Sequence, residues 1–223
     1  MRIDLPVPLV LQEKDSVECG LAGLSMLYGF YGKSKTIAEL KEHIKIHAVG
    51  TYAPQLGTFL RKDGFHVEII THHPSLFVKK EQQLSQEELK EKFKLSLEKQ
   101  QTENVKNVLQ YFHEFLENKG KLTVKIPTPD DVIFQLKQGH PVGALVTSNF
   151  VHGSKAVFNY HFLLIRGVTE TGFIVNDPIP DERGGVKEYT FDEFRYALYA
   201  SAAGDLDNAS LFIAYPDVHT RPA

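Results

Sequence analysis

The stretch VECGLAGLSMLYGFYG, from Val17 to Gly32, decides how the chain is interpreted, because it holds the only cysteine at the start of an apolar run. Apolar residues cover most of a helical wheel here, which is typical of a buried helix, and Gly32 stands where a glycine commonly ends one. Cys19 then lies in the first turn, where unpaired N–H groups and the helix dipole favour a thiolate. The position allows a nucleophilic thiol, but by itself it favours the simpler interpretation of Cys19 as a small buried hydrophobic residue.

Small residues surround this thiol, and Gly20 and Gly23 leave room for a neighbouring backbone or a substrate to come close. We expect Gly20 to contact substrate. Gln12 lies just upstream of the helix. Its side-chain NH2 group and the backbone N–H of Cys19 are candidate donors to the oxyanion that forms when sulfur attacks a carbonyl.

A thiol nucleophile needs an imidazole to take its proton and a group that orients the imidazole. Of the ten histidines, His161 opens the apolar strand HFLLIRGV, and Asp177 ends the next predicted strand, GFIVND. Antiparallel pairing would bring these two ends together. The rival base is His152, in a loop before the strand; we prefer His161 because a strand fixes its ring, and expect His152 to line the cleft or contact substrate.

The order of predicted elements favours an α+β fold, since helices come first and a cluster of strands comes last. Short loops between the late strands predict a mainly antiparallel sheet. The predicted helices are Thr36 to about Ile46, Ala53 to Lys62, Pro129 to Lys137 and FDEFRYALYA; the predicted strands are FHVEII, PVGALVTS, YHFLLIRGV, GFIVND and SLFIAYP. We expect a single domain over residues 1–223.

Residues 79–121 differ in composition, being rich in Glu, Lys and Gln with apolar residues at helical spacing. They predict one or two exposed helices inserted into the domain, ending near Gly120. A solvated decoration is the simpler interpretation, and a surface for a protein partner is the alternative.

The whole composition excludes several classes of function. With 223 residues, a formal charge of −3 and a pI near 6.4, the chain has no broad electrostatic footprint for nucleic acid or an anionic membrane. No apolar run approaches a membrane span, and the N-terminus does not resemble a secretory signal. We expect a soluble, cytoplasmic protein with no cofactor. His43 and His47 have the spacing of paired metal ligands, but no Glu stands beside His43 in the required order and no third ligand is nearby, so we expect no metal.

Four motifs in this order resemble the C39 peptidases. These are papain-like cysteine proteases that cut leader peptides after a Gly-Gly pair, commonly as N-terminal domains of bacteriocin-exporting ABC transporters. The similarity covers about residues 6–215 apart from the insertion, and it rests on Gln12 with Glu18-Cys19-Gly20 and Phe30-Tyr31-Gly32, on VIFQLKQGHPVGALV, on His161-Phe162, and on Asn176-Asp177-Pro178.

The resemblance implies a papain-like fold in which an N-terminal helical part packs on a C-terminal sheet. It also implies Cys19 as nucleophile, His161 as general base and then acid, Asp177 as the orienting group and Gln12 as oxyanion donor. Six residues separate Gln12 from Cys19, one more than is usual in the transporter domains. No nucleotide-binding loop is found, so we expect a stand-alone relative whose substrate need not be a Gly-Gly leader.

Three hypotheses follow from the sequence. The first is a cysteine hydrolase that cleaves a peptide or isopeptide bond in a peptide or protein substrate through a thioester. The second uses the same thioester chemistry as an acyltransferase, transglutaminase or deamidase. The third is a non-catalytic binding module on the same scaffold, with the insertion as its working surface.

Overall fold

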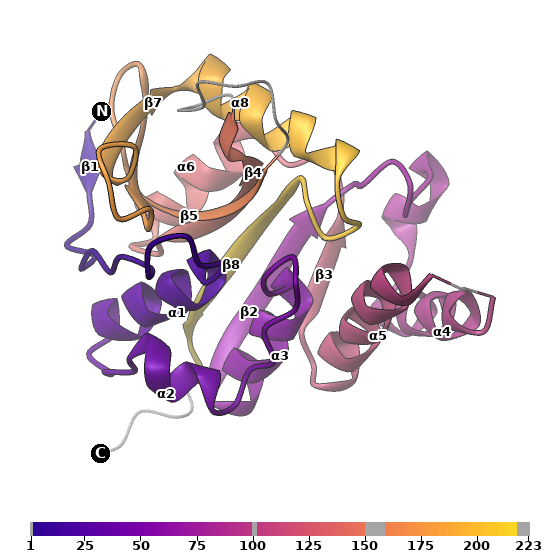
Figure 1. Ribbon diagram of the computed structural model, residues 1–223. Helices are drawn as coiled ribbons and strands as arrows, with labels where there is room; N and C mark the ends of the chain where they lie inside the picture. Colours follow the sequence, from indigo (N-terminus) through magenta and orange to yellow (C-terminus); the bar gives the residue numbers. More distant parts are fainter. Residues whose placement is uncertain (1, 100–101, 150–158, 218–223) are drawn as a thin grey trace.

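One sheet runs through the described part of the chain and separates two groups of helices (Figure 1). The computed structural model describes residues 2–99, 102–149 and 159–217. The strands follow the order β3-β2-β8-β4-β5-β6-β7, with β1 paired to β5. Their bounds are β1 (Ile3–Asp4), β2 (Phe65–Thr71), β3 (Lys121–Val124), β4 (Val142–Thr147), β5 (Tyr160–Val168), β6 (Gly172–Asp177), β7 (Gly185–Thr190) and β8 (Ser210–Pro216).

Helices cover both faces of this sheet. One face carries α1 (Cys19–Phe30), α2 (Ile37–Lys41), α3 (Ala53–Lys62), the short η1 (Lys79–Gln83), α4 (Gln86–Leu97) and α5 (Glu103–Glu117). The other face carries α6 (Pro129–Lys137) and α8 (Phe191–Ala200), after which η2 (Ser201–Ala203) leads towards β8. The sheet is therefore the middle layer of three.

Strand β5 shows why the late strands are apolar at almost every position. Phe162 and Leu164 belong to the core under α1, whereas Leu163 and Ile165 belong to the core under α6 and α8. A strand that is buried on both faces has no polar side, so its sequence does not alternate. The α+β class and the mainly antiparallel sheet are confirmed, because among the described strand pairs only β2 and β3 run parallel.

Two details of the predicted fold are corrected. The helix expected to reach about Ile46 ends at Lys41, because the backbone N–H groups of His43 and Ile44 return to the Leu40 carbonyl and close the last turn. The predicted strand FHVEII, which forms β2, joins the same sheet and lies beside β8 over its whole length. The sequence pattern missed three strands: β1 and β3 are short, and β7 is exposed at several positions.

The 79–121 segment connects the two parallel strands β2 and β3, which need a long crossover. Its helices α4 and α5 bury their apolar faces in the main core. The rings of Phe93 and Phe112 stack with centroids 5.1 Å apart, and neither is exposed to solvent. The segment is thus helical as predicted, but it completes the core rather than decorating it. That its outer face binds a partner stays a prediction.

Candidate active site

The start of α1 is held against the sheet by glycines on both sides of the Phe162 ring. A Cβ atom at Gly23 of α1 or at Gly143 of β4 would overlap that ring. A Cβ atom at Gly20 would overlap the Thr51 hydroxyl in the same way. The close approach expected at Gly20 and Gly23 is therefore present, and it places Cys19 next to the beginning of β5.

His161 lies at the start of β5 and Asp177 at the end of β6, and antiparallel pairing brings these two strand ends together. The two strands pair antiparallel, as the sequence predicts, and the structure places Leu164 opposite Asn176. His161 Nε2 lies 2.9 Å from Asp177 Oδ1, which also accepts a hydrogen bond of 3.1 Å from the Ile179 N–H. Both side chains are buried, with Asp177 wholly inaccessible to solvent. The imidazole is thus held from behind by a carboxylate, and its other face is turned towards the thiol.

The interaction of Cys19 with His161 shifts both pKa values in the direction of an ion pair. Burial by itself would raise the pKa of the thiol, but the hydrogen bond and charge of His161, with the N–H groups of Phe162 and Gly20, lower it below the ordinary value. Burial by itself would lower the pKa of His161, but the Asp177 charge and hydrogen bond, followed by Cys19, raise it to about 10. The pair therefore favours a thiolate beside an imidazolium near neutral pH.

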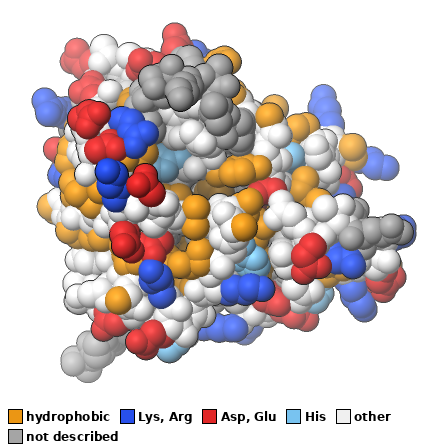
Figure 2. Space-filling view, in the orientation of Figure 1, with side chains coloured by type: hydrophobic (Ala, Val, Ile, Leu, Met, Phe, Trp, Pro, Cys, Tyr) orange, Lys and Arg blue, Asp and Glu red, His pale blue; other side chains and the backbone are white. Residues whose placement is uncertain are grey.

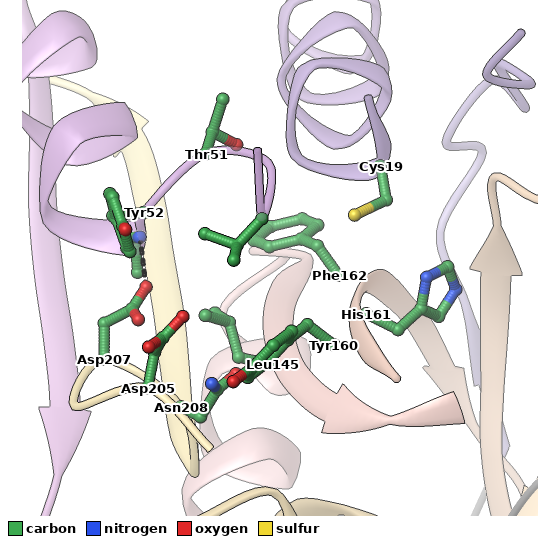
Figure 3. Close-up of a pocket in the computed structure, with 12 residues that line it drawn as sticks. Cys19, Thr51, Tyr52, Leu145, Tyr160, His161, Phe162, Asp205, Asp207 and Asn208 are labelled. Carbon is green, nitrogen blue, oxygen red and sulfur yellow. Dashed lines mark hydrogen bonds between the residues drawn. The ribbon is translucent and has the colours of Figure 1, made fainter. Parts of the chain in front are cut away.

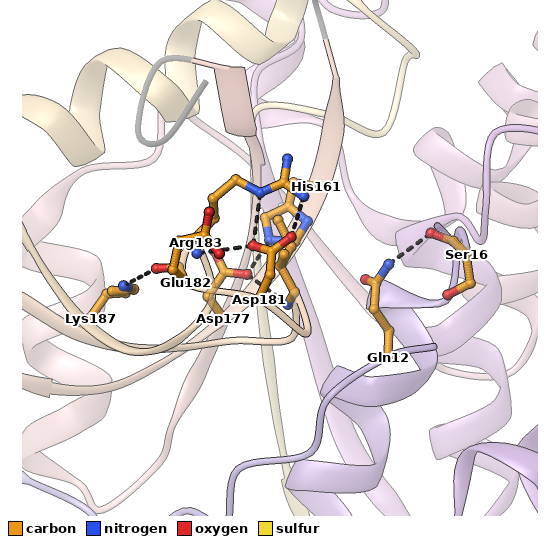
Figure 4. A network of polar contacts seen from close by, with 9 residues as sticks. Gln12, Ser16, His161, Asp177, Asp181, Glu182, Arg183 and Lys187 are labelled. Carbon is orange, nitrogen blue, oxygen red and sulfur yellow. Dashed lines mark hydrogen bonds and ion pairs between the residues drawn. The ribbon is translucent and has the colours of Figure 1, made fainter. Parts of the chain in front are cut away.

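The sequence Asn176-Asp177-Pro178 also anchors the extended N-terminal segment. The Asn176 amide donates to the carbonyls of Val7 and Pro8 at 3.2 and 3.1 Å, and the Pro178 carbonyl accepts from the Gln12 N–H at 2.8 Å. Neighbouring residues at the end of one strand thus hold the histidine and deliver Gln12 to the same cleft (Figure 4).

Within the described part of the chain, one hydrogen bond orients the Gln12 side chain, from its Nε2 to the Ser16 carbonyl at 2.7 Å (Figure 4). An amide NH2 group has two N–H donors, so one remains for another acceptor. Gln12 and Cys19 line one open pocket of about 390 Å³, together with His161 and Arg183. This arrangement leaves Gln12 available as a donor near the thiol.

A second, narrower pocket opens on the other side of Cys19 (Figure 3). Cys19, His161 and Phe162 form one side, and the loop between η2 and β8 supplies Asp205, Asp207 and Asn208 on the other. The space-filling view shows a hollow edged by hydrophobic side chains near the centre of this face (Figure 2). The two pockets meet at the thiol and the imidazole, as expected for a site that holds a chain on both sides of a reacting bond.

The structure brings together four of the predicted site residues, namely Cys19, His161, Asp177 and Gln12. Gly20 is buried against Thr51 and lines neither pocket, so its contact with substrate stays a prediction. His152 lies outside the described residues. Among the residues that the structure does describe, no group of three or more His, Cys, Asp or Glu side chains could hold a metal ion.

The acidic loop was missed by the sequence analysis. Asp205, Asp207 and Asn208 follow a short helix and precede a strand, where such residues are ordinary turn formers. The one signal was their density, two carboxylates and an amide in four residues of GDLDNAS.

Across residues 2–99, 102–149 and 159–217, no helix has the length and apolar character to cross a membrane.

Comparison with known proteins agrees with the fold. A solved structure described as a putative C39-like peptidase from Bacillus anthracis superposes with a TM-score of 0.56 at 12% identity, covering 97% of this chain and 98% of the other. A double glycine motif protease from an AMS/PCAT transporter, in complex with the leader peptide, superposes with a TM-score of 0.50 at 15% identity, covering 96% and 94%. Both matches support the papain-like fold. No curated protein matches the chain.

A family comparison extends over most of the sequence. The model of the Peptidase_C39 like family matches residues 4–204, from the first strand to the loop after η2. This range includes the start of α1, the β5 and β6 strand ends and the 79–121 crossover. The chain belongs to the Peptidase_C39 like family.

Proposed function

We propose that the protein is a cysteine peptidase that hydrolyses a peptide or isopeptide bond, with Cys19 as nucleophile, His161 as base and then acid, and Asp177 as the group that orients the imidazole. The observation that carries this proposal is the buried His161–Asp177 pair, 2.9 Å apart, facing the thiol at the start of α1. A structural cysteine would need no such pair.

The proposed reaction begins with the thiolate and the imidazolium in place. The Cys19 sulfur attacks the carbonyl carbon, and the oxyanion accepts hydrogen bonds from the Cys19 N–H and the free N–H of Gln12. Because His161 Nε2 is bonded to Asp177, Nδ1 is the ring nitrogen that gives its proton to the leaving amine. The C–N bond breaks and a thioester remains. His161 then takes a proton from water, whose oxygen attacks the thioester, and the acid is released as the Cys19 thiolate re-forms beside the imidazolium.

The substrate class rests on the family and on one structural relative. That relative was solved with a leader peptide bound. We therefore propose a peptide or protein substrate for this chain, without assigning a Gly-Gly preference. We also retain the cytoplasm as the proposed location, because a thiol of lowered pKa is readily oxidised and stays active in a reducing compartment.

The first test is the rate of Cys19 alkylation by iodoacetamide between about pH 4 and 10, in the wild type and in His161→Ala. The single cysteine makes the readout specific. We expect the wild type to stay reactive well below pH 8, and the variant to lose about a hundredfold in rate at pH 6. His43→Ala is the matched control, since this exposed histidine stacks on Phe59 away from the thiol. Equal profiles for wild type and His161→Ala would remove the chemical basis of the proposal.

A second measurement separates hydrolysis from acyl transfer. The thioester is trapped on Cys19 with an activated peptide ester, and its decay is followed in buffer and with added primary amines. We expect decay that amines do not accelerate. Faster decay with a new amide product would instead assign the chain to the acyltransferases or transglutaminases.

A further inference from the structure

The narrow pocket beside Cys19 has an unusual polar lining. Its interior leaves about 30 Å³, room for one or two water-sized groups. Asp205, Asp207 and Asn208 face the thiol across this space, and aliphatic and aromatic side chains such as Leu145 and Phe162 form its rim (Figure 3). A group of a substrate bound to the thiol can enter this space, because Cys19 lines it.

The two carboxylates have no cationic partner. Asp207 is 2% exposed and accepts a hydrogen bond of 2.8 Å from the Ala53 N–H. Burial raises its pKa to about 7, and burial also raises the pKa of Asp205. Among the described residues, no Lys, Arg or His side chain forms an ion pair with either group. Burying carboxylates without a cation is unfavourable, so the pocket is electrostatically incomplete.

Two further polar groups in the pocket lack partners. Asn208 is 2% exposed and lines the pocket, yet its side-chain amide has no hydrogen-bond partner among the described residues. The Thr51 hydroxyl, also at the pocket, is buried and without a partner in the described part of the chain. A buried hydroxyl without a partner in a native structure calls for an explanation, and a ligand that donates hydrogen bonds supplies one.

We propose that this pocket binds a primary ammonium group of the substrate, next to the bond that is cut. An ammonium is compact, carries a full positive charge and has three donors and no acceptor. The pocket offers it the carboxylates of Asp205 and Asp207, with the oxygens of Asn208 and Thr51. The planar guanidinium of arginine is larger and has five donors, which fits this space less well. The inference rests on the proposed function and adds a substrate class: the ammonium is a lysine side chain or the free N-terminus of the peptide.

The 79–121 segment contributes to this pocket through Asn104, at the start of α5. The Tyr52 hydroxyl donates to Asn104 Oδ1, and Asn104 Nδ2 donates to Asp205 Oδ1. One oxygen of Asp205 is thereby occupied, and the carboxylate is turned towards the pocket (Figure 3). Asn104 is a positioning residue, and the crossover helix acts on specificity without touching the thiol.

The test uses peptidyl chloromethyl ketones that alkylate Cys19, in two matched pairs. Acetyl-Lys-Gly against acetyl-norleucine-Gly reports a side-chain ammonium, and Gly-Gly against acetyl-Gly-Gly reports a free N-terminus. Rates are measured by intact mass at pH 7.5. We expect about a tenfold preference for the ammonium in one of the pairs, which identifies its source. Equal rates within both pairs would overturn the inference.

Variants locate the effect. Asp205→Asn keeps the shape and the contact with Asn104, and we expect it to reduce the preference to about twofold or less. Asn104→Ala should reduce the preference while the norleucine probe keeps its rate, a split that a merely structural role would not produce. Glu170→Gln removes one negative charge at an exposed turn and should change nothing. A preference that survives Asp205→Asn would also overturn the inference.

Iodoacetamide separates this inference from the proposed function. It is small and uncharged, so its rate reports the thiol and not the pocket. If iodoacetamide reacts fast at acidic pH but the probe pairs do not differ, only the ammonium site is wrong. If the thiol itself has ordinary reactivity, the proposed function fails, and the inference fails with it.

Discussion

Two buried carboxylates lie on opposite sides of the same thiol, and their surroundings differ. Asp177 is fully buried behind His161 and accepts hydrogen bonds from the ring and from the Ile179 N–H. Asp207 is nearly as buried but accepts its hydrogen bond from the Ala53 N–H. The first carboxylate helps to raise the pKa of His161 to about 10, whereas burial raises the pKa of Asp207 itself to about 7.

The difference shows that the partner, and not the depth of burial, decides the charge of a carboxylate in this fold. Opposite charges at contact compensate the loss of hydration, and neutral backbone N–H groups compensate it only in part. The charge of Asp177 is therefore compensated within the chain, by the imidazolium of His161. The Asp207 side lacks a cation, which we propose the substrate brings.

The largest effect is expected when the charge of Asp177 is removed. Asp177→Asn keeps the side-chain shape, but without the carboxylate the burial of His161 lowers the pKa of the imidazole. We expect the rate of peptide hydrolysis to fall about a hundredfold or more, with Cys19 losing its reactivity at acidic pH. Asp192→Asn is the control, because that exposed carboxylate pairs only with Arg195 on the surface of α8. If the pH profile of Cys19 alkylation is unchanged in Asp177→Asn, the carboxylate of Asp177 does not set the charge of His161. The contrast drawn here between Asp177 and Asp207 would then be wrong.

A smaller effect is expected from Gly23→Ala, which changes the packing behind Cys19 and His161 and leaves the Asp207 side of the thiol unaltered. The new methyl group would overlap the Phe162 ring and push α1 away from β5. Overpacking of this kind costs about 1–3 kcal/mol of stability. We expect slower hydrolysis and weaker low-pH reactivity of Cys19, measured beside a thermal melt. Ala22→Gly, which removes a buried methyl from the same helix without that overlap, serves as a control for stability. Unaltered thiol reactivity would mean that the Phe162 contact does not set the distance to His161.

The smallest effect concerns stability against pH. The pKa of folded Asp207, about 7, lies above the ordinary value of 3.8, so its contribution to stability falls as pH rises between these values. His161 acts in the same direction at higher pH: its contribution is full below pH 6.5 and is lost as pH rises through about 10. Asp207→Asn should therefore reduce the fall in Tm between about pH 4.5 and 7.5. Each kcal/mol of unfolding free energy corresponds to about 2–4 °C in Tm for a chain of this size.

Asn at this position can still accept the hydrogen bond from the Ala53 N–H, so the cap on α3 is kept. Differential scanning calorimetry of the two proteins at both pH values gives the comparison. An identical pH slope for Asp207→Asn and wild type would show that Asp207 titrates normally, which would weaken the case for an unfilled cation site.

Much of the site could be predicted from the sequence, because its parts are local patterns. The apolar wheel after Cys19, the glycine at its end and the start of a strand at His161 depend on residues close in the chain. The hairpin between β5 and β6 is short, so the approach of Asp177 to His161 follows from pairing alone. The α+β class and the family follow from the order of these patterns, and both are confirmed.

Other features depend on residues far apart in the chain, and only the tertiary structure decided them. The charged composition of residues 79–121 hid a buried face, since an amphipathic helix has the same sequence pattern whether its apolar side meets a core or a partner. The sequence pattern predicts only turn residues at Asp205, Asp207 and Asn208. The chain then enters β8, which pairs with β4 and β2, and this pairing brings the loop to Cys19. Sequence patterns report interactions between residues that are close in the chain. The pocket instead depends on which distant segments pair in one sheet.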